Sequence, residues 1–167
     1  MTNTYPINTH PINTCLINTD RLRIRTASDA EMRILIENEA DEALKAAYGE
    51  MLELSLKNPD RRQWYAAWFI ESAEGEHIGE LCFKGLNEEG GIEIGYGILP
   101  EHQGCGYASE AVAAVTDWAL AQDGVKYILA ETEAGNAASQ RVLLKSGFVL
   151  TGDMGDEGPG FIRRRED

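Results

Sequence analysis

Cysteine, histidine and proline are scarce in this chain, with three, three and five residues of each among 167. The three cysteines, Cys15, Cys82 and Cys105, have neither paired spacing nor the spacing of metal ligands. That pattern excludes a disulfide framework and a zinc site. Scattered, unpaired thiols are typical of a reducing compartment, so we expect a cytoplasmic protein that holds no metal.

Long apolar runs are also missing. No stretch approaches the roughly 18 apolar residues of a membrane-spanning helix, and the polar N-terminus does not resemble a signal peptide. The apolar fraction is 43%, which is ordinary for a folded globular protein. The sequence therefore predicts a folded protein without a membrane partner.

Basic residues are few: the sequence has 15 basic and 28 acidic residues, and its net charge is −13. Such a field repels nucleic acid and steers cationic molecules toward the protein. The acidity is also explained by solubility alone. We expect no nucleic-acid partner, and a ligand that, if charged, is cationic.

The chain length suits one domain with a sizeable core. Residues 1–18 differ from the rest, because Ile-Asn-Thr recurs there at Ile7, Ile12 and Ile17. This five-residue period is too short for a structural repeat. We predict an extended or mobile N-terminal arm over residues 1–18 and a single domain over residues 19–167.

Local signals predict alternating helices and strands. Ser28 with Glu31 forms a capping box that starts a helix, and Asn58-Pro59 ends the next helical stretch. Apolar alternation and turn residues mark the strands. The expected helices are 28–36, 41–56, 109–121 and 136–147, the expected strands are 65–71, 77–84, 91–99, 126–133, 148–151 and 161–165, and 152–160 is expected as a loop.

A glycine-rich turn, Gln103-Gly104-Cys105-Gly106-Tyr107-Ala108, lies between a predicted strand and a predicted helix. A turn of this kind leaves backbone N–H groups at the helix start without partners. Together with the positive end of the helix dipole, these donors favour a phosphate or pyrophosphate group. The turn therefore predicts a site for a phosphorylated cofactor.

The P-loop pattern is absent, and the dinucleotide pattern G-x-G-x-x-G is half met because Ser109 replaces its third glycine. The letters that do match are Q-x-x-G-x-A, given by Gln103, Gly106 and Ala108. This motif resembles the acetyl-CoA pyrophosphate loop of the GNAT superfamily of N-acetyltransferases. Residues 19–25, 93–96, 106–111 and 136–148 resemble, in order, further segments of its ribosomal-protein N-acetyltransferase (RimJ/RimL-like) subgroup.

The resemblance implies an α/β (α+β) fold, with a mixed, mainly antiparallel twisted sheet flanked by helices on both faces. It implies acetyl-CoA as cosubstrate, with the pantetheine arm along Ile98 and Leu99 and an amide of that arm bonded by Asn136. The cofactor-binding residues that it implies are Ile98, Leu99, Gln103, Gly104, Cys105, Gly106, Tyr107, Ala108, Ser109, Asn136 and Ser139.

Acyl transfer to an amine needs a base, because an alkylammonium with a pKa of about 10.4 is no nucleophile at neutral pH. Glu93 is the candidate base; it shares one strand face with Gly95 and Gly97 and is equally well explained as a solvated carboxylate. Ser139 is the candidate donor to the leaving thiolate, or a small residue where a helix meets the cofactor. Many GNAT enzymes carry a tyrosine acid where this chain has Leu143, so the general acid is left unassigned.

Three functions are compatible with these motifs. The first is an N-acetyltransferase, monomer or homodimer, that acetylates a primary amine of a small molecule or of a protein N-terminus. The second is a CoA-binding GNAT-fold module without catalysis, suggested by the leucine at position 143. The third is a Rossmann-type nucleotide-binding protein, which the missing third glycine disfavours.

Overall fold

A computed structural model describes residues 15–166, whose contacts group into two compact units that meet in sequence at Phe83 and Lys84. Residues 16–18, at the end of the predicted N-terminal arm, form a short strand. Residues 1–14 of that arm, with the first two Ile-Asn-Thr triplets, lie outside the described residues.

Four antiparallel strands of the first unit pair in chain order. The register is set by pairs such as Leu16↔Arg25 and Ile24↔Ile70. Residues 74–76, between the two predicted strands 65–71 and 77–84, connect them in a turn, with Gly75 at a φ of 88°. These strands are β1 (Leu16–Asn18), β2 (Leu22–Thr26), β3 (Trp68–Ser72) and β4 (His77–Lys84).

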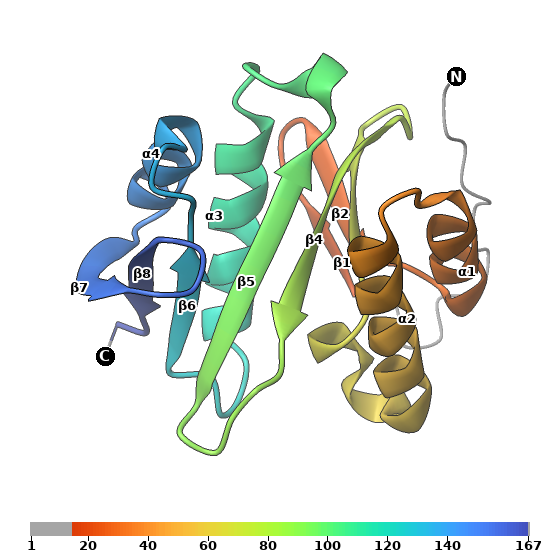
Figure 1. Ribbon diagram of the computed structural model, residues 1–167, viewed down its shortest axis with the longest axis horizontal. Coiled ribbons are helices and arrows are strands. Elements are labelled where there is room, and N and C mark those ends of the chain that lie inside the picture. Colours follow the sequence, from red (N-terminus) through yellow and green to blue (C-terminus); the bar gives the residue numbers. More distant parts are fainter. Residues whose placement is uncertain (1–14, 167) are drawn as a thin grey trace. The chain divides into compact units, whose positions relative to one another are not determined.

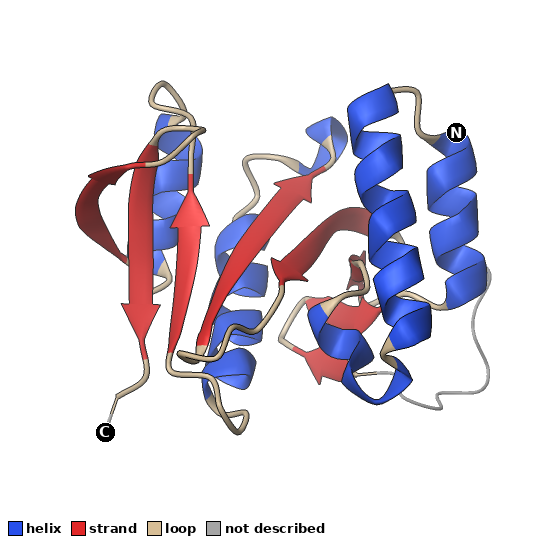
Figure 2. Ribbon diagram, turned by 60° about the horizontal axis from the view of Figure 1, so that its bottom comes forward, coloured by secondary structure: helices blue, strands red, loops and turns tan. Residues whose placement is uncertain are grey.

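Two helices of this unit, α1 (Asp29–Asn38) and α2 (Glu42–Lys57), lie side by side in Figures 1 and 2. Both begin at the residues that the sequence indicates. Ser28 and Glu31 form the predicted capping box, and the Asp41 carboxylate accepts the Leu44 N–H at 2.9 Å. Their apolar faces pack in one core, made of Ala27, Met32, Leu35, Ala66, Ala67 and Phe69 with Tyr48, Met51 and Leu52 beside it.

The predicted strand 65–71 begins three residues late, at Trp68. A 3-10 helix, η1 (Pro59–Trp64), occupies the preceding segment. Pro59 fixes the backbone of its first turn, and the N–H groups of Tyr65 and Ala66 both bond the Arg62 carbonyl. These local bonds keep residues 65 and 66 out of the sheet.

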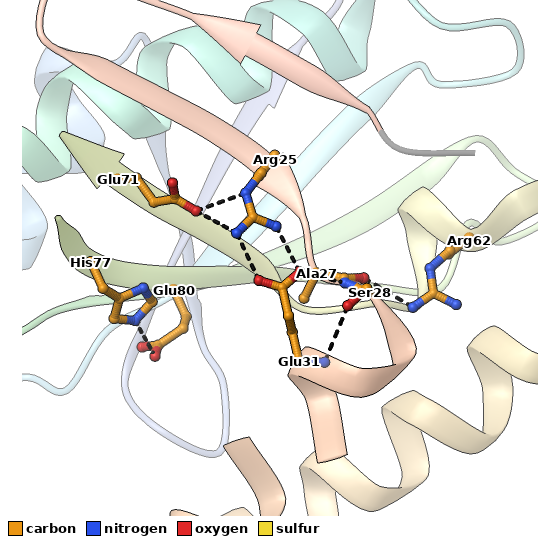
Figure 3. A network of polar contacts seen from close by, with 8 residues as sticks. All are labelled: Arg25, Ala27, Ser28, Glu31, Arg62, Glu71, His77 and Glu80. Atoms are coloured by element: carbon orange, nitrogen blue, oxygen red, sulfur yellow. Dashed lines mark hydrogen bonds and ion pairs between the residues drawn. The ribbon is translucent and has the colours of Figure 1, made fainter. Parts of the chain in front are cut away.

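Arg25 joins β2, β3 and α1 through a buried carboxylate, Glu31, and a partly buried one, Glu71 (Figure 3). Its guanidinium donates to both carboxylate oxygens of Glu31, at 2.8 and 2.7 Å, and to Glu71 at 2.7 Å. The Glu31 side chain is fully buried. Burial by itself would raise the pKa of Glu31, but hydrogen bonds from Arg25 and from the Ser28 N–H, with the charge of Arg25, lower it below its usual value.

We therefore expect the substitution Glu31→Gln to destabilise the protein by about 2–4 kcal/mol at neutral pH, because it leaves Arg25 poorly compensated. A lowered carboxyl pKa contributes stability that is present above the unfolded pKa of about 4.3 and is lost as the pH falls through the folded value. Urea unfolding from pH 7 to pH 3 should therefore show the gap between wild type and variant closing in acid. A gap independent of pH would contradict this account; Glu53→Gln, in an exposed pair with Lys57, is the control.

The second unit holds one parallel strand pair and two antiparallel pairs, in the order β5-β6-β8-β7. The predicted loop 152–160 is wrong at both ends, because the flanking strands extend into it. Met154 pairs with Pro159, and the Gly155 N–H bonds the Gly158 carbonyl across a tight turn. The strands are β5 (Gly91–Ile98), β6 (Tyr127–Glu131), β7 (Val149–Met154) and β8 (Pro159–Arg164).

Helices α3 (Tyr107–Leu120) and α4 (Ala137–Lys145) belong to this unit, and α3 lies against β5 and β6 (Figure 1). The sheet face that carries Ile92, Ile94, Ile128 and Ala130 is buried. Helix α3 starts at Tyr107, two residues before the predicted Ser109. The expected α/β class, with mixed and mainly antiparallel strand pairing, is confirmed.

Candidate functional site

Strands β5 and β6 run together at their starts and then separate (Figure 2). Their parallel register goes from Gly91↔Tyr127 to Glu93↔Leu129, although β5 continues to Ile98. A Cβ placed on Gly97 would meet nothing within 4 Å. The second half of β5 therefore offers a backbone edge that β6 does not pair, and the strand face at Gly97 is open.

The end of β5 leads directly into the glycine-rich turn. Ile98 is the last strand residue, and Leu99 precedes a 3-10 helix, η2 (Pro100–His102). The Gln103 side chain reaches back and donates to the Ile98 carbonyl at 3.0 Å. Through this bond, Gln103 holds the glycine-rich turn against the end of β5.

The turn needs its glycines. Gly104 and Gly106 have φ values of 78° and 81°, a region that side chains with a Cβ rarely adopt. Gly106 is also the N-cap of α3, and no side chain caps this helix. Among residues 15–166, the other three α-helices are capped by Ser28, Asp41 and Asn136.

Four of the predicted cofactor residues, from Gln103 to Gly106, are exposed on this turn. Tyr107, Ala108 and Ser109 follow as the first three residues of α3. The Tyr107 ring meets the His102 ring edge-on, with 6.4 Å between centroids, so the two rings pack across the turn. Residues 103–109 therefore form one continuous segment at the start of α3. This helix start has no side-chain cap, so its N–H groups suit an anionic group.

Glu93 lies on β5 where the ladder with β6 ends. Its carboxylate pairs with Lys84 Nζ at 3.4 Å, and its side chain is 34% exposed. Because side chains alternate along a strand, Glu93 and Tyr96 lie on opposite faces. The predicted base is therefore accessible to solvent and next to a single cation.

Ser139 lies in the first turn of α4, which Asn136 caps by accepting the Ser139 N–H at 3.0 Å. The hydroxyl of Ser139 is 2.7 Å from the hydroxyl of Tyr96. Burial raises the pKa of Tyr96, and the hydrogen bond with Ser139 opposes this shift. Sequence reasoning did not link Tyr96 to Ser139; strand alternation places Tyr96 on the same face as Ile92 and Ile94 and gives no signal for this contact.

Leu143, at the position of the tyrosine acid in many relatives, is fully buried. It is a core residue of α4, so no hydroxyl is available there. The hydrogen bonds of the described residues link Ser139 to β5 but do not link Glu93 to Ser139. Within residues 15–166, no three His, Cys, Asp or Glu side chains are placed to hold a metal ion, and no helix has the length and apolarity to cross a membrane.

Comparison with known proteins gives one family. The acetyltransferase (GNAT) domain family matches residues 17–149. The uncharacterized N-acetyltransferase YoaA of Bacillus subtilis (strain 168) is 32% identical over 146 residues, which are 80% of this chain and 82% of that protein. The ribosomal-protein-serine acetyltransferase of Escherichia coli (strain K12) is 32% identical over 53% of this chain and 50% of that protein.

Solved structures agree on the fold. The spermidine N-acetyltransferase of Vibrio cholerae, in complex with CoA and spermine, has a TM-score of 0.70 at 18% identity. The match covers 88% of this chain and 97% of that one. The family match and the YoaA similarity lead to one conclusion: the chain belongs to the GNAT family of acetyl-CoA-dependent N-acetyltransferases.

Proposed function

We propose that this protein transfers the acetyl group of acetyl-CoA to a cationic primary amine, and that residues 103–109 hold the pyrophosphate of the cosubstrate. The observation that carries the proposal is the start of α3, which follows a left-handed glycine and has no side-chain cap. First-turn N–H groups and the helix dipole then favour an anion at this point.

The free edge of β5 supports the position of the pantetheine arm. Beyond Glu93 the strand is no longer paired with β6, so its backbone is available to amides of a ligand. Ile98 and Leu99 lie at the end of this edge, next to the turn. The Asn136 side-chain oxygen already caps α4, so its amide nitrogen is the group that would bond a ligand carbonyl.

Acetyl-CoA supplies the acyl group as an activated thioester; the chain must position it and remove a proton from the amine. A group lying along the β5 edge can be reached from both faces of the strand. Glu93 approaches from the exposed face, as the base that takes the amine proton directly or through water. Ser139 approaches from the buried face, as the donor to the departing sulfur.

We assign the acceptor to the cationic amines because the protein itself carries a strong negative charge. A net charge of −13 raises the local concentration of cations and speeds their encounter with the protein. Polyamines and protein N-termini both present such amines. No disulfide joins Cys15, Cys82 and Cys105 within the described residues, which supports a cytoplasmic location.

We expect thiol release from acetyl-CoA to be fastest with polyamines or with basic N-terminal peptides, and slow with neutral amines. The value of kcat/KM for the cationic acceptor should fall as salt rises from 50 to 500 mM, because screening removes the attraction. An acidic or neutral amine that reacts faster, or a kcat/KM that does not respond to salt, would overturn the charge argument and leave acetyl transfer itself untouched.

A further inference from the structure

A single side-chain contact connects the middle of β5 to the first turn of α4. The Tyr96 hydroxyl is 2.7 Å from Ser139 Oγ and 3.2 Å from the Ser139 carbonyl oxygen. Both residues are partly buried, and both lie in the unit that holds the glycine-rich turn. The same tyrosine oxygen therefore faces two acceptors on one residue.

Counting protons gives two arrangements. In the first, Tyr96 donates to the Ser139 carbonyl and accepts the Ser139 hydroxyl proton. In the second, Tyr96 donates to Ser139 Oγ, and the Ser139 proton turns toward a third group. Both arrangements use the 2.7 Å contact between the two hydroxyls, and the first also uses the longer 3.2 Å contact with the Ser139 carbonyl. Only the second arrangement lets Ser139 donate to a ligand.

We propose that Tyr96 is a positioning residue for acetyl transfer: it donates to Ser139 Oγ, so that Ser139 presents its proton to the sulfur as the thiolate leaves. This inference rests on the function proposed above. In that step the amine nitrogen forms the new bond to the acetyl carbon, the carbon–sulfur bond breaks, and its electron pair goes to sulfur. The ammonium first loses one proton to water, and the attacking nitrogen loses a second proton to Glu93, directly or through water, as the amide forms. Ser139 and Tyr96 keep their own protons.

Tyr96 acts through Ser139 and not as the acid. Burial holds the pKa of Tyr96 above its usual value near 10, whereas a thiol has a pKa of about 8.5. Transfer of a proton from the Tyr96 phenol to the thiolate would therefore be unfavourable in free energy. The thiolate is stabilised by a hydrogen bond, and the chain needs no tyrosine at the position of Leu143.

The test uses the variants Tyr96→Phe and Ser139→Ala, and the double variant. For each, ultraviolet absorbance of the thiolate gives the pKa of the CoA thiol bound to the protein. We expect Tyr96→Phe to raise this pKa and to lower kcat by roughly tenfold, with KM for acetyl-CoA unchanged. Ser139→Ala should act similarly, and the double variant should be no worse than Ser139→Ala.

Tyr127→Phe is the matched control, since Tyr127 lies at the start of β6 against Arg164, away from the turn. It should leave the thiol pKa and kcat unchanged. If Tyr96 only braces α4 against β5, its loss would lower the melting temperature or raise KM, add to the effect of Ser139→Ala, and leave the bound thiol pKa unchanged. That result would overturn the role of Tyr96 alone, whereas wild-type protein that fails to bind CoA would overturn the proposed function as well.

Discussion

Replacing Gly106 by valine is expected to abolish measurable acetyl-CoA binding. Gly106 has a φ of 81° and is the N-cap of a helix without a side-chain cap. A β-branched residue would push the backbone out of this conformation and turn the first N–H groups of α3 away from the pyrophosphate. We expect a loss of affinity of at least about a hundredfold by calorimetry, since several charge-assisted hydrogen bonds act together.

Gly152→Val is the matched control for this effect. Gly152 has a similar φ of 87°, with open space around it, and lies on β7 in the same unit. Both substitutions should cost about 1–2 kcal/mol of stability through backbone strain. Only Gly106→Val should lose acetyl-CoA; equal affinities in the two variants would remove the turn from the binding site.

Replacing Glu93 by glutamine is expected to lower kcat by roughly 10²–10⁴, the usual contribution of a general base. The amide keeps the shape of the side chain but cannot take a proton from the amine. Acetyl-CoA affinity should remain unchanged, because the turn at residues 103–109 is unaltered. Pre-steady-state measurement of acetyl transfer at pH 6 to 9 would locate the loss in the chemical step.

The variant Lys84→Met tests whether Glu93 acts as a base or through its ion pair with Lys84. Lys84 Nζ is 3.4 Å from the Glu93 carboxylate, so the variant removes the cation and keeps the base. We expect Lys84→Met to retain most of the wild-type kcat. If both variants lose activity equally, Glu93 acts through its ion pair; if neither does, Glu93 is a solvated carboxylate on the strand.

The sequence predicts those parts of this site that depend on local signals. Side-chain caps at Ser28 and Asn136 placed two helix starts, because the bonds that they make span three residues. Gly104 and Gly106 indicated a turn with positive φ for the same reason. The order of these signals was enough to identify the family.

Contacts between distant residues were not predictable in this way. Tyr96 and Ser139 are 43 positions apart, and nothing near either residue indicates the other. The hairpin at 154–159 was missed because glycine and aspartate disfavour strands locally, whereas pairing between β7 and β8 overrides that preference. Cross-strand pairing and packing, rather than local propensity, decide such segments.

Acetyl-CoA-dependent release of CoA thiol, with and without a polyamine or a basic N-terminal peptide, tests the central claim most directly. We predict that thiol appears only when the amine is present, and that the amine gains one acetyl group by mass spectrometry for each thiol released. Tight binding of acetyl-CoA without amine-dependent release from any acceptor would contradict the claim. The chain would then be a CoA-binding module on a GNAT fold.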